Sequence, residues 1–472
     1  MSVPIKNQRP SPRVSAAAFY LTVWRWHFYA GLIVAPFVIF LAITGSIYLW
    51  KPQYENWRYH ALFNVPAGTA AVSADAQMKA AQAAMPPGWR AQTFQPAFAS
   101  GQTSQVAFAA TGKIAPSKFV RTVFVDPSTG RVVGQLDDRT RFMRIIHDLH
   151  GTLLMGNAGG YVIEFAAGWA LVLLLTGLYL WWPRPKFVVW GFLLPRLRAK
   201  GRTFWRDVHA VPAVWLAAST LFLLSTGLLW TNAAGSWYRT ISAALGQGTP
   251  RESEAGAHRS ALTGWSPPLK SGLAEKIDAL ASTMPGHEGH HMGGTAPDVG
   301  PGENALSLDR VIAIANSQKV PQPYAIAPPV GPVGVYSVMS DRNQAFNRTY
   351  LHLDQYSGRV LADVRFKDFG YLAKFGLWAI IAHEGQLFGV INQILGTIAA
   401  AGVLLLAVSG LMMWWQRRPE DRLFAPASDA PLPRVVFAGT LILGCLLPLL
   451  GASLVLGWLA ERLIFRHATI DA

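Results

Sequence analysis

The chain contains a single cysteine, Cys445, among its 472 residues. One thiol cannot form an intramolecular disulfide, and neither covalent haem attachment through C-x-x-C-H nor a cysteine-ligated iron–sulfur cluster is available to it. The sequence also lacks a P-loop, a dinucleotide-binding G-x-G-x-x-G after a strand, H-E-x-x-H and G-x-S-x-G. Any redox cofactor must therefore be bound non-covalently, through residues other than cysteine.

Charged residues are scarce, at 14% of the chain against 51% hydrophobic residues, which is too apolar for an ordinary soluble domain. A helix that spans a bilayer needs about 20 mostly apolar residues. Five stretches reach this length: residues 27–50, 160–182, 209–230, 388–415 and 435–458. Tryptophans near their ends are typical of the aromatic belt of a membrane protein. The first stretch has no small-residue cleavage signal, so we expect it to be retained.

Acidic residues are nearly absent from two of the short segments that flank these stretches. Residues 1–26 hold four basic residues and no acid, and residues 183–208 set seven basic residues against Asp207 alone. The positive-inside rule places both segments, together with residues 416–434, in the cytoplasm. The net charge of +15 is in part this topology signal, and no nucleic-acid-binding motif accompanies it. Segments 51–159 and 231–387 and the tail 459–472 then lie outside.

The two long outer segments end in the same pattern. Thr122 to Val133 reads T-V-F-V-D-P-S-T-G-R-V-V, and Thr349 to Leu361 reads T-Y-L-H-L-D-Q-Y-S-G-R-V-L. A strand, a turn on Asp with Ser or Thr and Gly, and a second strand predict a β-hairpin. Residues 247–304 are rich in Gly, Ser, Pro and His, which is typical of a flexible insert. The unit of helix, outer α+β domain and helix therefore occurs twice, with a fifth helix appended.

Four histidines occupy equivalent positions in these two units. His27 and His209 each lie 18 residues before a glycine that follows threonine, and His150 and His383 each lie 27 residues before another glycine. The glycines, in chain order, are Gly45, Gly177, Gly227 and Gly410. A glycine presents no side chain, so it allows helix backbones or a porphyrin to approach closely.

Depth in the membrane sorts the four histidines into two pairs. His27 and His209 begin stretches that leave the cytoplasm, whereas His150 and His383 precede stretches that return to it. Ionisable groups at such positions are costly and usually functional. The sequence thus predicts two non-covalent, bis-histidine b-type haems, one near each face of the membrane. His147 lies three residues before His150 and is an alternative ligand, although its counterpart in the second unit is Ile380.

Both units carry motifs of a known family. The D-x-x-[ST]-G-R-V hairpin and the H-G…T-G-L-Y-L-W-W-P-R helix, each repeated, resemble the PepSY-associated transmembrane proteins over residues 20–418. The resemblance implies two periplasmic α+β PepSY-like domains. It also implies a location in the bacterial inner membrane, because members of the family include reductases of ferric siderophores there. The N-terminus is then cytoplasmic and the C-terminus periplasmic.

The expected function is a dihaem reductase that carries electrons from the cytoplasmic side to a periplasmic ferric siderophore and releases ferrous iron. Electrons would come from a separate flavoprotein or from quinol, because the chain has no nucleotide-binding motif, and no acid–base catalytic residue is expected. One alternative acceptor is cupric ion or another periplasmic oxidant. A second His/Met cluster suits copper or iron capture, and consists of His287, His290, His291 and Met292. A rival of another class is a non-redox, membrane-anchored regulator of a peptidase.

Overall fold

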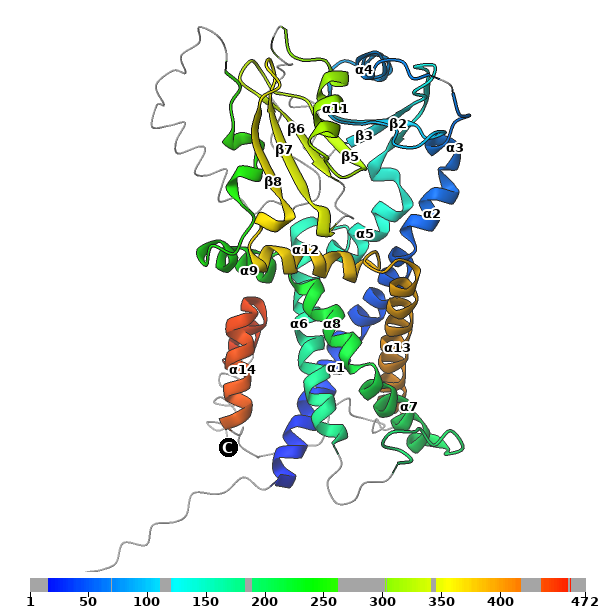
Figure 1. The fold of residues 1–472 in the computed structure, drawn as a ribbon. Coiled ribbons are helices and arrows are strands. Elements are labelled where there is room, and N and C mark those ends of the chain that lie inside the picture. The colour runs from blue at the N-terminus through cyan, green and yellow to red at the C-terminus, as the bar shows by residue number, and fades with distance from the viewer. Residues whose placement is uncertain are drawn as a thin grey trace, which may run out of the picture. The chain divides into compact units, whose positions relative to one another are not determined.

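The chain folds into helices and one β-sheet (Figure 1). The computed structural model describes residues 16–68, 70–110, 120–182, 189–261, 302, 304–340, 345–416, 434–456 and 459. Two compact units are present. The first comprises Met1–Ser46, Leu149–Gly235 and Ile394–Ala472, and the second comprises Ile47–Asp148 and Ser236–Gln393.

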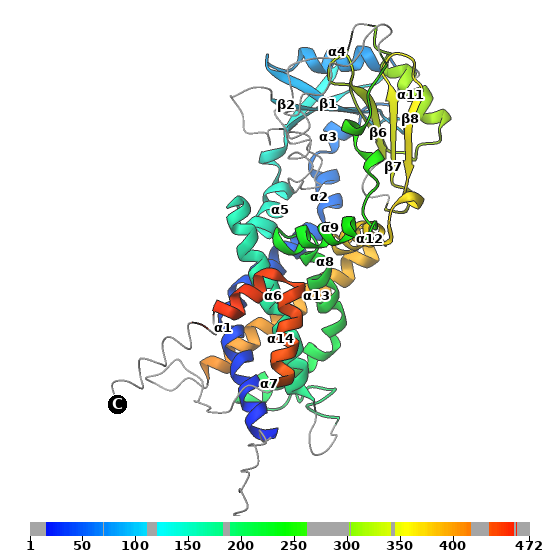
Figure 2. The ribbon, with the colours of Figure 1, turned by 90° about the vertical axis from the view of Figure 1, so that its left-hand side faces the viewer.

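Six of the described helices lie wholly or mostly in the first unit. They are α1 (Ala16–Leu49), α6 (Gly156–Trp181), α7 (Gly201–Trp215), α8 (Ala217–Leu228), α13 (Val390–Trp415) and α14 (Arg434–Leu446). Helices α1 and α6 lie side by side (Figures 1 and 2), and Phe19 packs edge-on against Tyr179 with ring centroids 5.0 Å apart. Such helices satisfy their own backbone hydrogen bonds, as the interior of a bilayer requires.

Among the described residues, three helices are long and apolar enough to cross a membrane: Phe19–Leu49, Gly156–Trp181 and Val390–Trp415. The expectation of five transmembrane helices is therefore not confirmed. The third expected span is two helices, α7 and α8, which meet at an angle of 65° and count as a fourth crossing only if the bent pair is one span. Pro212 within α7 lacks the N–H that would continue the helical hydrogen bonds. Within the described residues, α14 has only 13 residues and its helix is interrupted at Leu447.

Shorter helices and the strands make up most of the second unit. The helices are α2 (Lys51–Arg58), α3 (His60–Phe63), α4 (Ala74–Ala83), α5 (Phe142–Thr152), α9 (Ala233–Ala244), α11 (Leu308–Ser317) and α12 (Tyr371–His383). The strands are β1 (Trp89–Gln95), β2 (Ser104–Ala110), β3 (Val120–Val125), β4 (Val132–Asp137), β5 (Tyr324–Ala327), β6 (Val335–Ser340), β7 (Thr349–Asp354) and β8 (Val360–Arg365).

The strands of both outer segments belong to one antiparallel sheet. Its order is β4-β3-β2-β1-β5-β6-β7-β8, so four strands from each segment meet at the pair β1 and β5, where Phe94 is opposite Ile326. Phe94 and Ile326 are fully buried, and one hydrophobic core runs beneath the whole sheet. The two segments, expected as separate domains, therefore share a single core. Figure 1 shows the two sets of strands, cyan and yellow.

The two predicted hairpins are present. Strand β3 pairs with β4, and β7 pairs with β8. In the first turn the Asp126 carboxylate accepts hydrogen bonds from the Ser128 N–H and hydroxyl at 2.8 and 2.7 Å. In the second turn Asp354 accepts from the Ser357 N–H at 2.8 Å. The glycine of each turn has a φ of 71°, which side chains disfavour.

Helices α4 and α11 cap each other across the sheet core. The N–H of Ala74, the first residue of α4, donates to both carboxylate oxygens of Asp309 at 3.0 Å. The N–H of Leu308, the first residue of α11, donates to both oxygens of Asp75 at 3.1 Å. Because the first turn of a helix has unpaired N–H groups and a partial positive charge, each aspartate stabilises the other repeat's helix.

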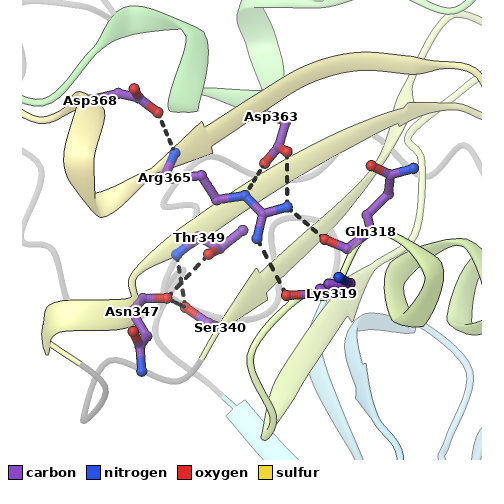
Figure 3. Close-up of polar contacts among 8 residues, drawn as sticks. All are labelled: Gln318, Lys319, Ser340, Asn347, Thr349, Asp363, Arg365 and Asp368. Carbon is purple, nitrogen blue, oxygen red and sulfur yellow. Dashed lines mark hydrogen bonds and ion pairs between the residues drawn. The ribbon is translucent and has the colours of Figure 1, made fainter.

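Arg365 fixes the last strand to the end of α11 (Figure 3). Its guanidinium pairs with both oxygens of Asp363 and donates to the carbonyls of Gln318 at 2.8 Å and Lys319 at 3.4 Å. Those carbonyls follow the last helical residue, where a positive charge is favourable. The backbone N–H of Arg365 donates to Asp368 at 2.8 Å, which holds the chain as it leaves β8.

Candidate functional site

The four predicted histidines lie on four different helices. His27 lies in α1, His150 in α5, His209 in α7, and His383 is the last residue of α12. The first three belong to the first unit and His383 to the second. The apolar pattern placed His27 at the start of its span. Helix α1 instead begins at Ala16, so His27 lies inside the helix. The candidate span starts at Phe19. Because an α-helix rises about 1.5 Å per residue, His27 lies about 12 Å along the helix axis from this start.

Two of these imidazoles meet within the first unit. The ring centroids of His27 and His209 are 6.3 Å apart, and the ring planes make an angle of 84°. The sequence predicted this pair from the repeat alone. The two residues are 182 positions apart in the chain, so the contact exists only because the helices of both repeats assemble.

The imidazoles of His27, His150 and His209 each contact a hydroxyl or carbonyl group on a neighbouring long helix. His27 Nδ1 lies 2.9 Å from the Thr176 hydroxyl of α6. His150 Nδ1 lies 2.9 Å from the Thr44 hydroxyl of α1. His209 Nδ1 lies 2.9 Å from the carbonyl of Leu406 and 3.2 Å from the Ser409 hydroxyl, both in α13.

These partners determine where the imidazole proton resides. The Thr176 hydroxyl donates its one proton to the Val172 carbonyl at 2.7 Å, so its oxygen accepts from Nδ1–H of His27. Thr44 likewise donates to the Phe40 carbonyl at 2.8 Å. A carbonyl such as that of Leu406 can only accept. Each histidine is therefore protonated on Nδ1, and in this tautomer an imidazole ligates a metal ion through Nε2.

A glycine makes room for each of these rings. A Cβ added to Gly177 would lie 3.2 Å from Cε1 of His27, and one added to Gly410 would lie 3.4 Å from Cε1 of His209. At Gly45 the distance to Cε1 of His150 would be 3.1 Å. Gly45, Gly177 and Gly410 thus face imidazoles from other helices.

The hydroxyl residues were missed as histidine partners, although the sequence carries a signal for them. Each of the four glycines follows a serine or threonine, and these are Thr44, Thr176, Thr226 and Ser409. Thr44, Thr176 and Ser409 each lie within hydrogen-bond distance of an imidazole. Thr226 Oγ1 donates to the Phe222 carbonyl at 2.7 Å, the same bond that Thr44 and Thr176 make within their own helices.

His147 has different surroundings from His150. Its side chain is 48% exposed, its Nδ1 lies 3.1 Å from the Asp148 carboxylate, and its ring lies 5.4 Å from that of Tyr48. It has neither the helix hydroxyl nor the glycine that accompany the other three imidazoles. The geometry therefore favours His150 over His147 as the candidate ligand.

Two buried carboxylates of the first unit have structural partners. Glu164 in α6 accepts hydrogen bonds at 2.8 Å from the N–H groups of Ala233 and Ala234, at the start of α9. Asp207 accepts from the guanidinium groups of Arg196 and Arg206. Arg196 and Arg206, two basic residues of the segment 183–208, thus form ion pairs within the chain. These bonds compensate the burial of both carboxylates.

Among the described residues, no group of three or more His, Cys, Asp or Glu side chains is placed to hold a metal ion. Bis-histidine ligation needs only two side chains, so this finding does not bear on it. The second predicted cluster, His287, His290, His291 and Met292, lies outside the described residues.

The apolar spans, the β-sheet unit and the paired imidazoles define a helical membrane protein with a repeated histidine frame. The family model described as the PepSY-associated TM region matches residues 24–417, and the chain belongs to this family. The resemblance drawn from the hairpin and helix motifs is thereby confirmed. No curated protein matches the chain in sequence.

Proposed function

We propose that the protein is a dihaem reductase of the bacterial inner membrane, with His27 and His209 as the ligands of the haem nearer the cytoplasm. The observation that carries the proposal is the meeting of these two rings, each protonated on Nδ1. Imidazole in this tautomer is the form that ligates iron through Nε2.

The spacing of the pair fits one iron atom between the rings. A metal–imidazole bond is about 2.0 Å long and the ring centre lies about 1.1 Å behind the nitrogen, so two rings on opposite sides of one metal have centroids about 6 Å apart. The separation of 6.3 Å agrees with this estimate. Perpendicular ring planes, close to the 84° found here, are compatible with bis-histidine ligation.

His150 and His383 would hold the second haem. His150 has the hydroxyl and glycine that accompany the inner ligands. The pairing with His383 rests on the repeat in the sequence, in which Thr226-Gly227 corresponds to Thr44-Gly45. When bound, the two haems would supply one-electron transfer across the membrane, and the chain would fix their depth and orientation.

The proposed acceptor is a periplasmic ferric siderophore, and the donor is a cytoplasmic flavoprotein or quinol. Support comes from the basic segments, which orient the spans, and from the membership of the family. Oxygen-rich chelators hold ferrous iron less tightly than ferric iron, so reduction releases the metal. Outer-sphere transfer requires no acid–base residue.

The decisive experiment is the optical spectrum and haem content of the protein purified in detergent. We expect about two b-type haems per chain, with the sharp reduced bands of low-spin bis-histidine iron. His209→Ala should lose one haem and His383→Ala the other. A haem-to-protein ratio near zero would remove the redox proposal and favour the regulator of a peptidase.

The acceptor is tested separately. Dithionite-reduced protein, freed of excess reductant, should be reoxidised anaerobically by a ferric siderophore, with ferrous iron appearing in a chelator trap. Deleting residues 286–294 should leave this reaction unchanged. If the deletion instead abolished reduction of cupric ion, and iron chelates were inactive throughout, copper would replace iron as the acceptor.

A further inference from the structure

A polar cluster lies one helical turn beyond the Thr44–His150 contact. Tyr48 is four residues after Thr44 in α1, and His147 is three residues before His150 in α5. One turn of helix rises about 5.4 Å. The two helices thus carry two successive layers: the layer that holds the candidate ligand, and a layer formed by Tyr48, Lys51 and His147, here named the outer cluster.

The outer cluster is built from hydrogen-bond donors. The rings of Tyr48 and His147 lie 5.4 Å apart, and Lys51 Nζ lies 3.5 Å from the Tyr48 hydroxyl. Lys51 Nζ is also 5.5 Å from the centre of the Tyr48 ring. An ammonium, a phenol and an imidazole in one group suit an acceptor-rich partner.

The neighbouring acids are engaged with arginines. Glu55, one turn beyond Lys51, pairs with Arg141 at 2.8 Å. Asp148 pairs with Arg144 at 3.0 Å and orients His147. The His147 side chain is about half exposed, so a molecule in solution can reach it.

The second repeat has no equivalent of this cluster. With the repeats aligned on their histidines, Tyr48 corresponds to Trp230, Lys51 to Ala233 and His147 to Ile380. The hydroxyl, glycine and histidine of the ligand layer occur in both repeats. Binding of a haem therefore does not require the outer cluster. Its residues are suited to a role that involves the first repeat only.

We infer that the outer cluster is the contact surface for the acceptor, and that it selects anionic, oxygen-rich ferric chelates. The inference rests on the proposed function. Lys51 supplies the charge, and His147, which lies beside the Tyr48 ring, donates to the chelate oxygens. One electron passes to the chelated ferric ion, which becomes ferrous, and no bond to the protein forms or breaks.

The test compares two probes of opposite charge on reduced, haem-loaded protein: ferric citrate, which is anionic, and ferrioxamine B, which is cationic. In Lys51→Gln/His147→Ala the second-order rate of reoxidation by ferric citrate should fall about tenfold and lose salt dependence, because steering by charge is removed. The rate with ferrioxamine B should change less than about twofold. Haem content and spectrum should match the wild type.

Lys374→Gln is the matched control, because Lys374 is a lysine of α12, the second-repeat counterpart of α5, and donates to the Lys367 carbonyl. It should leave both rates unchanged. Equal losses for both probes, no loss for either, or loss of haem from the double variant would overturn the inference while leaving the proposed function standing. If the wild type were reoxidised by no ferric chelate, the proposed function would fail with it.

Discussion

His27 and His209 face each other with ring centroids 6.3 Å apart, and each is held through Nδ1 by a different long helix, α6 for the first and α13 for the second. The candidate inner site therefore draws on four helices and both repeats. The tautomer of each imidazole is fixed before any metal is bound, so the site is preorganised. Changes to the supporting residues should alter haem binding without touching a ligand.

The Thr176 hydroxyl is the first such residue. Thr176→Val keeps the side-chain shape but removes the acceptor for His27 Nδ1. We expect the affinity for the inner haem to fall about 10- to 100-fold, the usual cost of losing a ligand's hydrogen-bond partner. Haem titration of the apoprotein measures the change, and the reduced spectrum shows which haem is affected.

Ser46→Ala is the control for this substitution. Ser46 also donates within its helix, to the Ala42 carbonyl at 2.8 Å. It should bind both haems as the wild type does. Equal affinities in Thr176→Val and Ser46→Ala would show that the hydroxyl does not position His27.

The glycines give a second prediction. Gly177→Ala places a Cβ 3.2 Å from Cε1 of His27 and should displace that ring, whereas Gly45→Ala should displace His150. The first variant should lose the inner haem and the second the outer one. Gly31→Ala in α1 is the control, since its Cβ would meet Leu173 at an ordinary 3.8 Å. Loss of both haems from either variant would indicate general misfolding of the helices.

Local patterns in the sequence predicted the hairpins and the meeting of His27 with His209. Strand-turn-strand signatures depend on neighbouring residues only, and the repeat supplied the long-range pairing that a single copy could not. The glycines were noted as sites of close approach, but the serine or threonine before each one was not read as a histidine partner.

Features that depend on distant packing were not predicted. The pairing of Phe94 with Ile326 joins the outer segments into one sheet. The local sequence does not indicate this pairing, because each residue would also suit a buried strand of a separate domain. The 65° bend between α7 and α8 was hidden by continuous apolarity, although Pro212 lies four residues before the break at Leu216. Apolar content sets which residues can enter a bilayer, not whether the helix is straight.

The choice between two adjacent histidines is a third prediction. His150→Ala should lose the outer haem, since His150 has the Thr44 hydroxyl and the space at Gly45. His147→Ala should retain it, because His147 contacts Asp148 and Tyr48 instead. Haem stoichiometry of the two variants decides the matter. If His150→Ala retained the outer haem and His147→Ala lost it, His147 would be the ligand.

The reciprocal caps of α4 and α11 give a prediction about stability. Asp75→Ala and Asp309→Ala each remove the acceptor for the first N–H of the other helix. Each should lower the free energy of unfolding by about 1 kcal/mol, the usual cost of a lost N-terminal cap. Urea denaturation of the full-length protein measures this. Asp309→Asn, which keeps an acceptor oxygen, should cost less than Asp309→Ala; equal costs would argue against the cap.

Acid should weaken the two hairpins selectively. Hydrogen bonds, chiefly from the Ser128 hydroxyl, lower the pKa of Asp126. At Asp354 burial acts in the opposite direction, but hydrogen bonds from Ser357 and Ala261 outweigh it, and the pKa is lowered too. A carboxyl whose pKa is lower in the folded state stabilises the fold above its unfolded pKa, near 3.8. That stabilisation is lost as the pH falls through the folded pKa.

Hydrogen exchange of β3–β4 and β7–β8, corrected for the intrinsic rate, should therefore accelerate as the pH falls below about 4. In Asp126→Asn/Asp354→Asn the exchange should be faster at pH 6 and should change little on acidification, because the titrating groups are gone. The β1–β2 pair, which has no such aspartate turn, serves as the internal reference. An acid response of the same size in the double variant would assign the pH dependence to other carboxylates of the sheet.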